Sequence, residues 1–460
     1  MADVANGAKS LEARIQEAGS PLKLLRRSPV GAFVFPNIPP EHTSWRDEQR
    51  AWRQDCVLVD MSFHMTELHI RGADCVKLLA GLATNKLDPF PVLRGKQLIF
   101  LGHNGYMIGD VIAFREAEDH VRLVGAPSAI HWVQFNAETG NFNVEVVRRE
   151  SFYGRSGDSP DEFRIQVQGP KALALMQEVT DKTLPDIKFF HIGEFKISGR
   201  PVRALRHGMA GEAGFEIYGP WASKADIVAA LEETGRKYGF RRVGYMAMTT
   251  PSQESGWMPL PLPAIYDGAE MKPYREWLSG NALESIASLG GSYHSDDIAD
   301  YYLEPVEMGY KGLIDFEHDF VGRDAVRKIV ENPRRKRVTL EWNNDDVLAC
   351  FGSALTDPGN GGMYMKLPNP MYATFQSDTI RKNGNHIGIS QCLSFSVNAG
   401  CMISPSVVDI EHAEPGTEVV VLWGEKNSER PVVDKHQIRE IRGRIAPSPY
   451  FKRVNKSENL

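Results

Sequence analysis

A glycine-rich stretch from Arg206 to Pro220 carries the residues whose types and spacing could do chemistry. Its last part alternates in hydropathy, which places Glu216 and Tyr218 on one face of an expected strand and the apolar residues on the other. The glycines before this strand allow the backbone to approach a ligand closely. A carboxylate on a rigid strand can accept two parallel hydrogen bonds, which suits a flat heterocycle with adjacent N–H groups. A plain β-hairpin with a solvated glutamate would show the same pattern, so these residues alone leave both interpretations open.

The same stretch resembles the folate-binding signature of the glycine cleavage T-protein (aminomethyltransferase) superfamily. Two further segments resemble that family: Gln168-Gly169-Pro170 matches its QGP signature, and Pro305 to Ala325 is similar to its P-x-E-x-G…F-x-G-[RK]-x-A stretch. Within the superfamily, the sequence is most similar to the tetrahydrofolate-dependent aryl O-demethylases of the vanillate/3-O-methylgallate type. The segments that carry this similarity are LRHGMAG (Leu205–Gly211), ESGWMPLPLPAIYDG (Glu254–Gly268), YREWL (Tyr274–Leu278), HDFVGRDA (His318–Ala325) and VLWGE (Val421–Glu425).

This resemblance implies an enzyme that moves the methyl group of a methoxybenzoate to N5 of tetrahydrofolate and releases a phenol. Glu216 matches the residue that holds the pterin in the family, and Tyr218, Gln168 and Trp257 are further candidates for binding the cofactor. His64 is the expected catalytic donor, because the demethylases also carry a histidine there and a histidine can give a proton near neutral pH. Core packing would equally account for Trp257, and the QGP segment could simply shape a turn.

Several positions that are polar in vanillate-type demethylases are apolar in this chain. Phe35 and Met248 replace tyrosines, Met61 replaces a glutamine and Ala126 replaces an arginine. The expected substrate-binding residues are therefore Phe35, Met61, His64, Ala126, His131 and Met248, with His131 as a replacement partner for the substrate carboxylate. Such a pocket would leave the polar groups of a hydroxylated benzoate unsatisfied. We therefore expect a low-polarity or chlorinated methoxybenzoate such as dicamba, with a vanillate- or syringate-type lignin aromatic as the alternative.

Two other functions within the superfamily fit the sequence less well. The aminomethyltransferase carries paired acidic residues in an N-x-x-x-x-D-D turn, where this chain has Gly109-Asp110 and so lacks one carboxylate. Asp110 could be no more than a residue at the end of a strand. The non-catalytic folate-binding protein that supports iron–sulfur enzymes carries a K-G-C-Y-x-G-Q-E signature, which has no counterpart here.

Composition and charge argue against several other classes of protein. The chain has 460 residues, of which 42% are hydrophobic and 24% charged, as expected of a soluble globular protein with two to four domains. A net charge of −6 gives no electrostatic reason to expect nucleic acid or an acidic membrane as partner. The five cysteines form no CxxC pair, which argues for a reducing compartment and against a zinc site or a disulfide scaffold. Because residues 1–20 lack the apolar core of a signal peptide, we expect a cytoplasmic protein. We further expect a monomer or a small homo-oligomer.

The expected fold is α+β, and the resemblance implies a three-domain cloverleaf of glycine cleavage T-protein type. Its parts would be an N-terminal α+β domain (1–155), a folate-binding α+β domain (156–330) and a C-terminal β-barrel (331–460). The pattern strand, glycine, helix occurs twice, at residues 66–82 and again at 163–179, which indicates two related units on antiparallel sheets. Helices are also expected over residues 10–27, 43–53 and 223–238, and a hairpin with an Asn104-Gly105 turn over residues 97–114. Barrel strands are expected at 338–342, 387–394 and 418–423.

Overall fold

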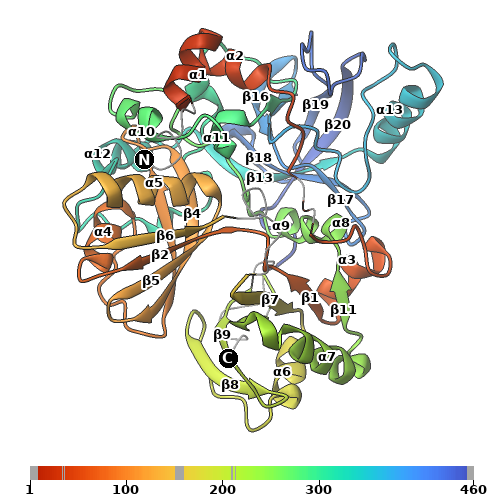
Figure 1. Ribbon diagram of the computed structural model, residues 1–460. Helices are drawn as coiled ribbons and strands as arrows, with labels where there is room; N and C mark the ends of the chain where they lie inside the picture. Colours follow the sequence, from red (N-terminus) through yellow and green to blue (C-terminus); the bar gives the residue numbers. More distant parts are fainter. Residues whose placement is uncertain are drawn as a thin grey trace.

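The computed structural model describes residues 9–33, 35, 37–150, 160–208, 211, 212 and 214–452. Three lobes, each built on its own sheet, surround a central region that holds α8 (Tyr245–Met248) and α9 (Thr250–Glu254) (Figure 1). The predicted α+β class and the three-part architecture with a C-terminal barrel are confirmed.

The first lobe is an antiparallel sheet of five strands covered by helices. Its strand order is β3 (Gly95–Leu101), β4 (Met107–Ala117), β5 (His120–Gly125), β2 (Thr66–Arg71) and β6 (Glu145–Arg149). The apolar residues of α4 (Cys75–Leu82) and α5 (Pro127–Thr139) complete its core. The predicted hairpin turn joins β3 to β4, where Gly105 takes a φ of 83° that favours glycine.

The second lobe is a sheet of six strands, with helices packed on its apolar face (Figure 1). Its order is β11 (Arg241–Val243), β1 (Val57–Asp60), β7 (Glu162–Gln168), β10 (Gly214–Pro220), β9 (Arg200–Arg206) and β8 (Ile192–Ile197). The covering helices are α6 (Ala172–Val179) and α7 (Lys224–Gly235).

The two predicted strand–glycine–helix units are present and use their glycines in the same way. Gly72 follows β2 with a φ of 132°, and Gly169 follows β7 with a φ of 123°. A Cβ atom would lie 2.2 Å from the carbonyl oxygen of Asn143 at the first glycine and 2.5 Å from that of Asp55 at the second. A neighbouring backbone therefore excludes any side chain at both turns.

The third lobe is a barrel that closes through the pairing of β13 with β18. Around the ring run β13 (Arg335–Trp342), β20 (Arg439–Ala446), β19 (Glu418–Trp423), β15 (Asp378–Lys382), β16 (Asn385–Ser390) and β18 (Cys401–Asp409). β17 (Ser394–Ser396) pairs with β18 in antiparallel fashion. α13 (Asn344–Thr356) lies outside the ring (Figure 1). Closure leaves the core strands of the barrel without an open edge.

The lobes are interleaved along the chain and cross the expected domain boundaries. β1 pairs with β7 and β11 in the second sheet, although we expected residues 57–60 in the first domain. Conversely, Tyr274 and Leu289 belong to the core of the first lobe, although they were expected in the second domain. Cutting the chain at residues 155 and 330 would therefore divide two hydrophobic cores.

The N-terminal helix predicted over residues 10–27 is in fact two helices. α1 (Leu11–Ala18) ends at Gly19, whose φ is 83°, and Ser20 then caps α2 (Pro21–Arg26) by accepting a hydrogen bond from the Lys23 amide. The sequence glycine, serine, proline therefore ends the first helix and begins the second, although the apolar residues keep a helical spacing through both. The remaining elements are α3 (Trp45–Gln54), α10 (Lys272–Trp277), α11 (Leu283–Ile286), α12 (Arg323–Glu331), β12 (Leu289–Gly290), β14 (Phe375–Gln376), and the 3-10 segments η2 (Trp221–Ser223), η3 (Arg236–Tyr238), η4 (Ile298–Tyr301), η5 (Lys311–Leu313) and η6 (Ile410–His412).

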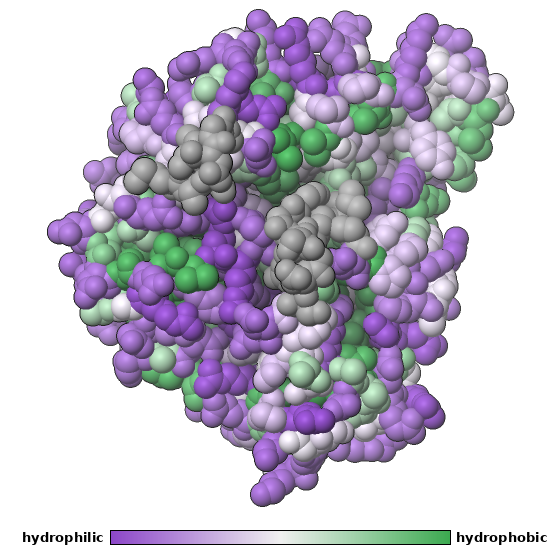
Figure 2. Space-filling model, viewed as in Figure 1, coloured by the Kyte–Doolittle hydropathy of each residue, from purple (hydrophilic) through white to green (hydrophobic). Residues whose placement is uncertain are grey.

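The surface is mostly hydrophilic on the face shown in Figure 2, with apolar side chains gathered in small areas. Among the described residues, Leu348 and Leu355 of α13 are the most exposed large apolar side chains, at 67% and 59%. All five cysteines are free. Over the described residues, no helix is long and apolar enough to cross a membrane, and no group of three or more acidic, histidine or cysteine side chains is arranged to hold a metal ion.

Candidate active site

Two cavities of opposite character meet in the centre of the molecule. The polar cavity, of about 730 Å³, lies between the first two lobes and includes Glu216 and Asp110 in its lining. The apolar cavity, of about 440 Å³, lies between the central helices and the barrel and includes Phe35 and Met248. The residues that line both are Met65, Gly125, Ala126, Trp257 and Pro259. Two ligands, one in each cavity, would therefore meet at a shared wall.

Glu216 projects from β10 into the polar cavity and is held by two side chains of the neighbouring strand. Arg164 Nη1 donates to its Oε1 at 3.0 Å, and Gln166 Nε2 donates to its Oε2 at 3.1 Å. Burial raises the pKa of Glu216, but the charge and hydrogen bond of Arg164 outweigh that effect and hold it below its ordinary value. The carboxylate is therefore ionised and fixed in direction before any ligand binds.

Gln168 supports this arrangement from behind and does not line either cavity. Its Nε2 donates to Oε1 of Gln166 at 2.9 Å, and it is fully buried. Arg164, Gln166 and Gln168 alternate along β7 and therefore share one face of the sheet. We did not single out Arg164 and Gln166 from the sequence, although the polar alternation in EFRIQVQ is the signal that could have identified them.

Tyr218 lies outside both cavities, although it shares a strand face with Glu216. Its ring packs against Phe114 at 5.6 Å between ring centroids, and the Arg122 guanidinium lies 4.2 Å from its ring centroid. Its hydroxyl group is 3.5 Å from Glu116. Tyr218 thus joins the second lobe to the first, and its expected place beside the cofactor is not supported by the geometry.

Asp110, on β4, lines the polar cavity. The sequence alone did not show whether this residue has a function or merely ends a strand, and its position in the cavity makes it a functional candidate. Gln97 Nε2 donates to its Oδ2 at 2.7 Å, and the Tyr310 hydroxyl also bonds to it. Burial raises the pKa of Asp110 to about 6, against the lowering effect of these hydrogen bonds. Tyr310 in turn accepts a hydrogen bond from Trp257 Nε1 at 3.1 Å, which links Asp110 to the shared wall.

His64 lines the apolar cavity, as do Phe35, Ala126 and Met248, whereas Met61 lines the polar cavity. The His64 ring lies 5.0 Å from that of Phe35, and its Nδ1 has no hydrogen-bond partner among the described residues. Burial, with a smaller contribution from Arg164, lowers the pKa of His64 to about 3. This corrects our expectation of a proton donor near neutral pH, because His64 is then neutral and can offer only the N–H of an uncharged imidazole.

Residues 29–260 match the family model described as the GCVT N-terminal domain. The chain belongs to the glycine cleavage T-protein family. It is 38% identical to the syringate O-demethylase of Sphingobium sp. (strain NBRC 103272 / SYK-6), over 96% of each chain. It is 27% identical to the sesamin methylene transferase of Sinomonas sp. (strain No.22), over 91% of this chain and 92% of that protein.

Aminomethyltransferases are also among the relatives of this chain. The aminomethyltransferase of Thermoanaerobacter sp. (strain X514) is 25% identical over 87% of this chain and 90% of its own length. The crystal structure of glycine cleavage system aminomethyltransferase T from Bartonella henselae superposes with a TM-score of 0.60 over 93% of this chain and 96% of that one. The identity between the two is 16%, so this likeness shows the shared fold alone.

As a member of the glycine cleavage T-protein family, the chain is an enzyme, a methyltransferase, and its cofactor is tetrahydrofolate. The polar cavity fits that cofactor. The ionised Glu216 suits the adjacent N–H groups of a pterin, and Lys86, Arg94 and Lys96 in the same lining suit the carboxylates of a glutamate tail.

His131 cannot take the role of carboxylate partner that we expected for it. It sits on the buried side of α5, is 4% exposed and lines neither cavity. Its Nδ1 lies 2.8 Å from Oε1 of Glu284, a carboxylate that is itself 1% exposed. The pair binds α5 to α11 inside the core of the first lobe, so His131 is a structural residue.

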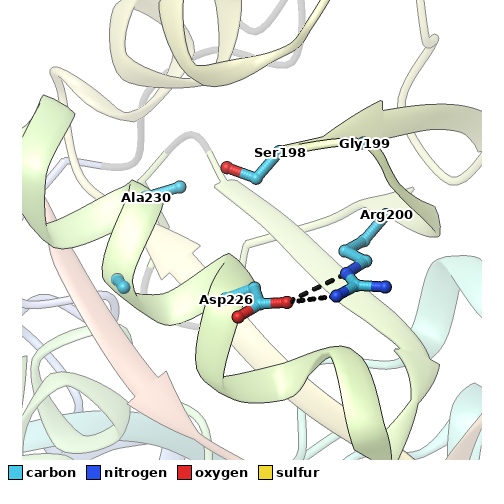
Figure 3. Close-up of a pocket in the computed structure, with 6 residues that line it drawn as sticks. Ser198, Gly199, Arg200, Asp226 and Ala230 are labelled. Carbon is cyan, nitrogen blue, oxygen red and sulfur yellow. Dashed lines mark hydrogen bonds and ion pairs between the residues drawn. The ribbon is translucent and has the colours of Figure 1, made fainter.

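A third hollow, of about 450 Å³, lies at the outer edge of the second lobe, beside the turn between β8 and β9. Figure 3 shows Arg200 and Asp226 directed at one another there, and Arg200 Nε donates to Asp226 Oδ2 at 2.9 Å. The two side chains are 53% and 49% exposed and satisfy each other. This hollow holds no convergent polar groups left over for a ligand and takes no part in the active site.

Proposed function

We propose that this enzyme demethylates an aryl methyl ether, with tetrahydrofolate as methyl acceptor and 5-methyltetrahydrofolate and a phenol as products. The observation that carries the proposal is the wall shared by the two cavities, one with buried carboxylates and the other lined by aromatic and aliphatic side chains. The names of two relatives, a syringate O-demethylase and a sesamin methylene transferase, support an aromatic ether as the other ligand.

The residues of the polar cavity bind and orient the cofactor. Glu216 accepts hydrogen bonds from the pterin, while Arg164 and Gln166 keep its carboxylate ionised and fixed in direction. Tetrahydrofolate, when bound, would supply N5 as the methyl acceptor, and the overall exchange would move one proton from N5 to the phenol oxygen. Asp110, with a pKa of about 6, is a carboxyl group of this cavity that can hold or release a proton near neutral pH.

The residues of the apolar cavity hold the ether and stabilise its leaving oxygen. A phenol has a pKa of about 10, so the departing oxygen carries negative charge that a hydrogen-bond donor can stabilise. His64 is the candidate donor, because it lines this cavity and is neutral, with one N–H to give. Trp257, fixed by its bond to Tyr310, forms the wall across which the methyl group passes.

The favoured substrate is a methoxybenzoate of low polarity, for example a chlorinated one such as dicamba. Support comes from Phe35, Ala126 and Met248, which line the apolar cavity at positions where the vanillate-type enzymes carry polar groups. The alternative substrate is a syringate- or vanillate-type lignin aromatic, which the name of the 38% identical relative favours.

The decisive test is anaerobic incubation of the purified protein with tetrahydrofolate and a panel that includes vanillate, syringate and dicamba. Stoichiometric formation of 5-methyltetrahydrofolate and one phenol, followed by chromatography, is the expected result. Binding of tetrahydrofolate without turnover of any aryl ether would contradict demethylation and favour an aminomethyltransferase or a non-catalytic folate-binding protein.

A further inference from the structure

Several hydrogen-bonding side chains that line the apolar cavity are already bonded to other parts of the protein. Thr249 donates to Asn369 at 2.9 Å, Gln376 donates to Asp378 at 2.9 Å, and Gln391 donates to Ser377 at 3.1 Å. These groups fix the wall of the cavity and have little capacity left for a ligand.

Gln253 is different. It lines the apolar cavity, is 3% exposed, and its side-chain amide makes no hydrogen bond within the described part of the chain. Its Oε1 is fully buried, whereas Nε2 is not among the fully buried unpaired atoms of the described residues. The amide N–H groups are therefore unused donors beside the cavity, and a ligand with a charged acceptor would gain affinity by accepting a hydrogen bond from them.

The position of Gln253 is rigid. The carbonyl of Gln253 accepts the Gly256 amide at 3.0 Å, and the Trp257 amide is bonded to Ser252 at 2.9 Å, so α9 ends in a tight turn that leads into the shared wall. The next residue, Glu254, accepts a hydrogen bond from Asn398 of the barrel at 3.1 Å. The amide is therefore presented on a fixed element close to the site of chemistry.

The charge of the lining indicates which group the amide would meet. Among the described residues, the apolar cavity is lined by no aspartate or glutamate and by one lysine, Lys366. Lys366 is exposed and makes no ion pair within the described part of the chain. A cavity with unused donors, one cation and no anion suits a ligand with a single negative charge.

We propose that Gln253 determines substrate specificity by donating its amide N–H to the carboxylate of the aromatic substrate. It takes the place that we had expected for His131, which is bonded to Glu284 outside the cavity. The proposal rests on the proposed function, since it assigns the acid group of the same methoxyaromatic ligand.

The test compares Gln253→Glu and Gln253→Met on a methoxybenzoate and on its uncharged methyl ester. Glutamate has the shape of glutamine but would repel a carboxylate, so we expect Gln253→Glu to raise KM for the acid about 30-fold or more and to change that for the ester less than about threefold. Gln253→Met should raise KM for the acid about tenfold, with kcat changed little, because it removes one hydrogen bond to a charged group. Gln391→Met is the matched control, since Gln391 lines the same cavity but is already bonded to Ser377.

Equal losses for acid and ester, or no loss for the acid, would overturn the proposal. A gain of Gln253→Glu on ring-hydroxylated substrates alone would also overturn it, because the amide would then face a hydroxyl group. An unchanged Kd for tetrahydrofolate shows that each variant is folded. If no aryl ether is turned over by the wild type, calorimetric binding of the benzoates to wild type and Gln253→Glu tests the assignment separately from the proposed function.

Discussion

Glu216 and Arg164 form a diagonal pair on two neighbouring strands, with Arg164 Nη1 3.0 Å from Glu216 Oε1 and both side chains almost fully buried. The guanidinium also donates to the carbonyl of Met61 at 3.0 Å and so reaches the segment that leads to His64. One buried cation therefore keeps the carboxylate of the polar cavity ionised and also helps to keep His64 neutral. The two cavities are linked by electrostatics as well as by their shared wall.

Glu216→Gln should weaken the binding of tetrahydrofolate about 30-fold or more, because a hydrogen bond to a charged acceptor contributes about 1.5–3 kcal/mol. It should also lower the free energy of unfolding by about 3 kcal/mol, since the buried Arg164 loses its nearer carboxylate and keeps only Glu67, at 3.6 Å, as an ionic partner. Calorimetric titration and denaturant unfolding measure the two effects. The control is Glu194→Gln, which removes an ion pair to Arg203 on the same sheet with the glutamate 55% exposed, and should change neither. An unchanged Kd in Glu216→Gln would contradict the assignment.

Asp110→Asn should make the protein more stable above pH 6 while reducing kcat about 100-fold or more. The pKa of Asp110 is raised from 3.8 to about 6, so the folded state binds more protons than the unfolded state between these values. Wild-type stability therefore falls as pH rises through this window, by up to about 3 kcal/mol at 1.36 kcal/mol per pKa unit. Melting temperatures of both proteins from pH 4 to 8 should diverge as pH rises. Parallel curves would show that Asp110 does not carry the raised pKa.

His64→Gln should lower kcat about 10- to 100-fold without removing the acid limb of the pH profile. Because the pKa of His64 is about 3, the imidazole stays neutral from pH 5 to 9, and a limb near pH 6 belongs to Asp110. The same lowered pKa predicts that His64 destabilises the wild type as pH falls from about 6.5 towards 3, where the unfolded chain binds a proton that the folded one does not. Profiles of kcat/KM against pH for the wild type and His64→Gln show which group causes the acid limb. Loss of the acid limb in His64→Gln would assign that limb to the histidine instead.

Met248→Tyr should shift preference towards ring-hydroxylated methoxybenzoates, because it returns a hydroxyl group to the apolar cavity. We expect the ratio of kcat/KM for vanillate to that for dicamba to rise about tenfold or more, from a new hydrogen bond and a less apolar wall. Met246→Leu, a volume-conserving change in the same lining, should leave the ratio unchanged. A fall in the ratio for Met248→Tyr would show that residue 248 does not select the substrate in this way.

The sequence alone identified features that depend on local pattern. Alternation placed Glu216 on a strand, the Asn104-Gly105 pair predicted the β3–β4 turn, and two glycines marked the repeated strand–helix units. These signals are local because side chains in a strand point to the same face at every second residue, and a turn with positive φ favours glycine. The resemblance to the glycine cleavage T-protein superfamily then supplied the fold, the cofactor and the class of enzyme.

Only the tertiary structure decided which side chains meet. Arg164 and Glu216 are 52 positions apart and come together through the register of β7 with β10, which no local pattern contains. His131 lies on a helix buried on most of its sides, so periodicity could not tell whether it faces the cavity or Glu284. The pKa values of Asp110 and His64 depend on how deeply each is buried, a property set by three lobes packed around one centre. Local sequence patterns thus identify candidate site residues, whereas the charge states and partners of these residues arise from long-range packing.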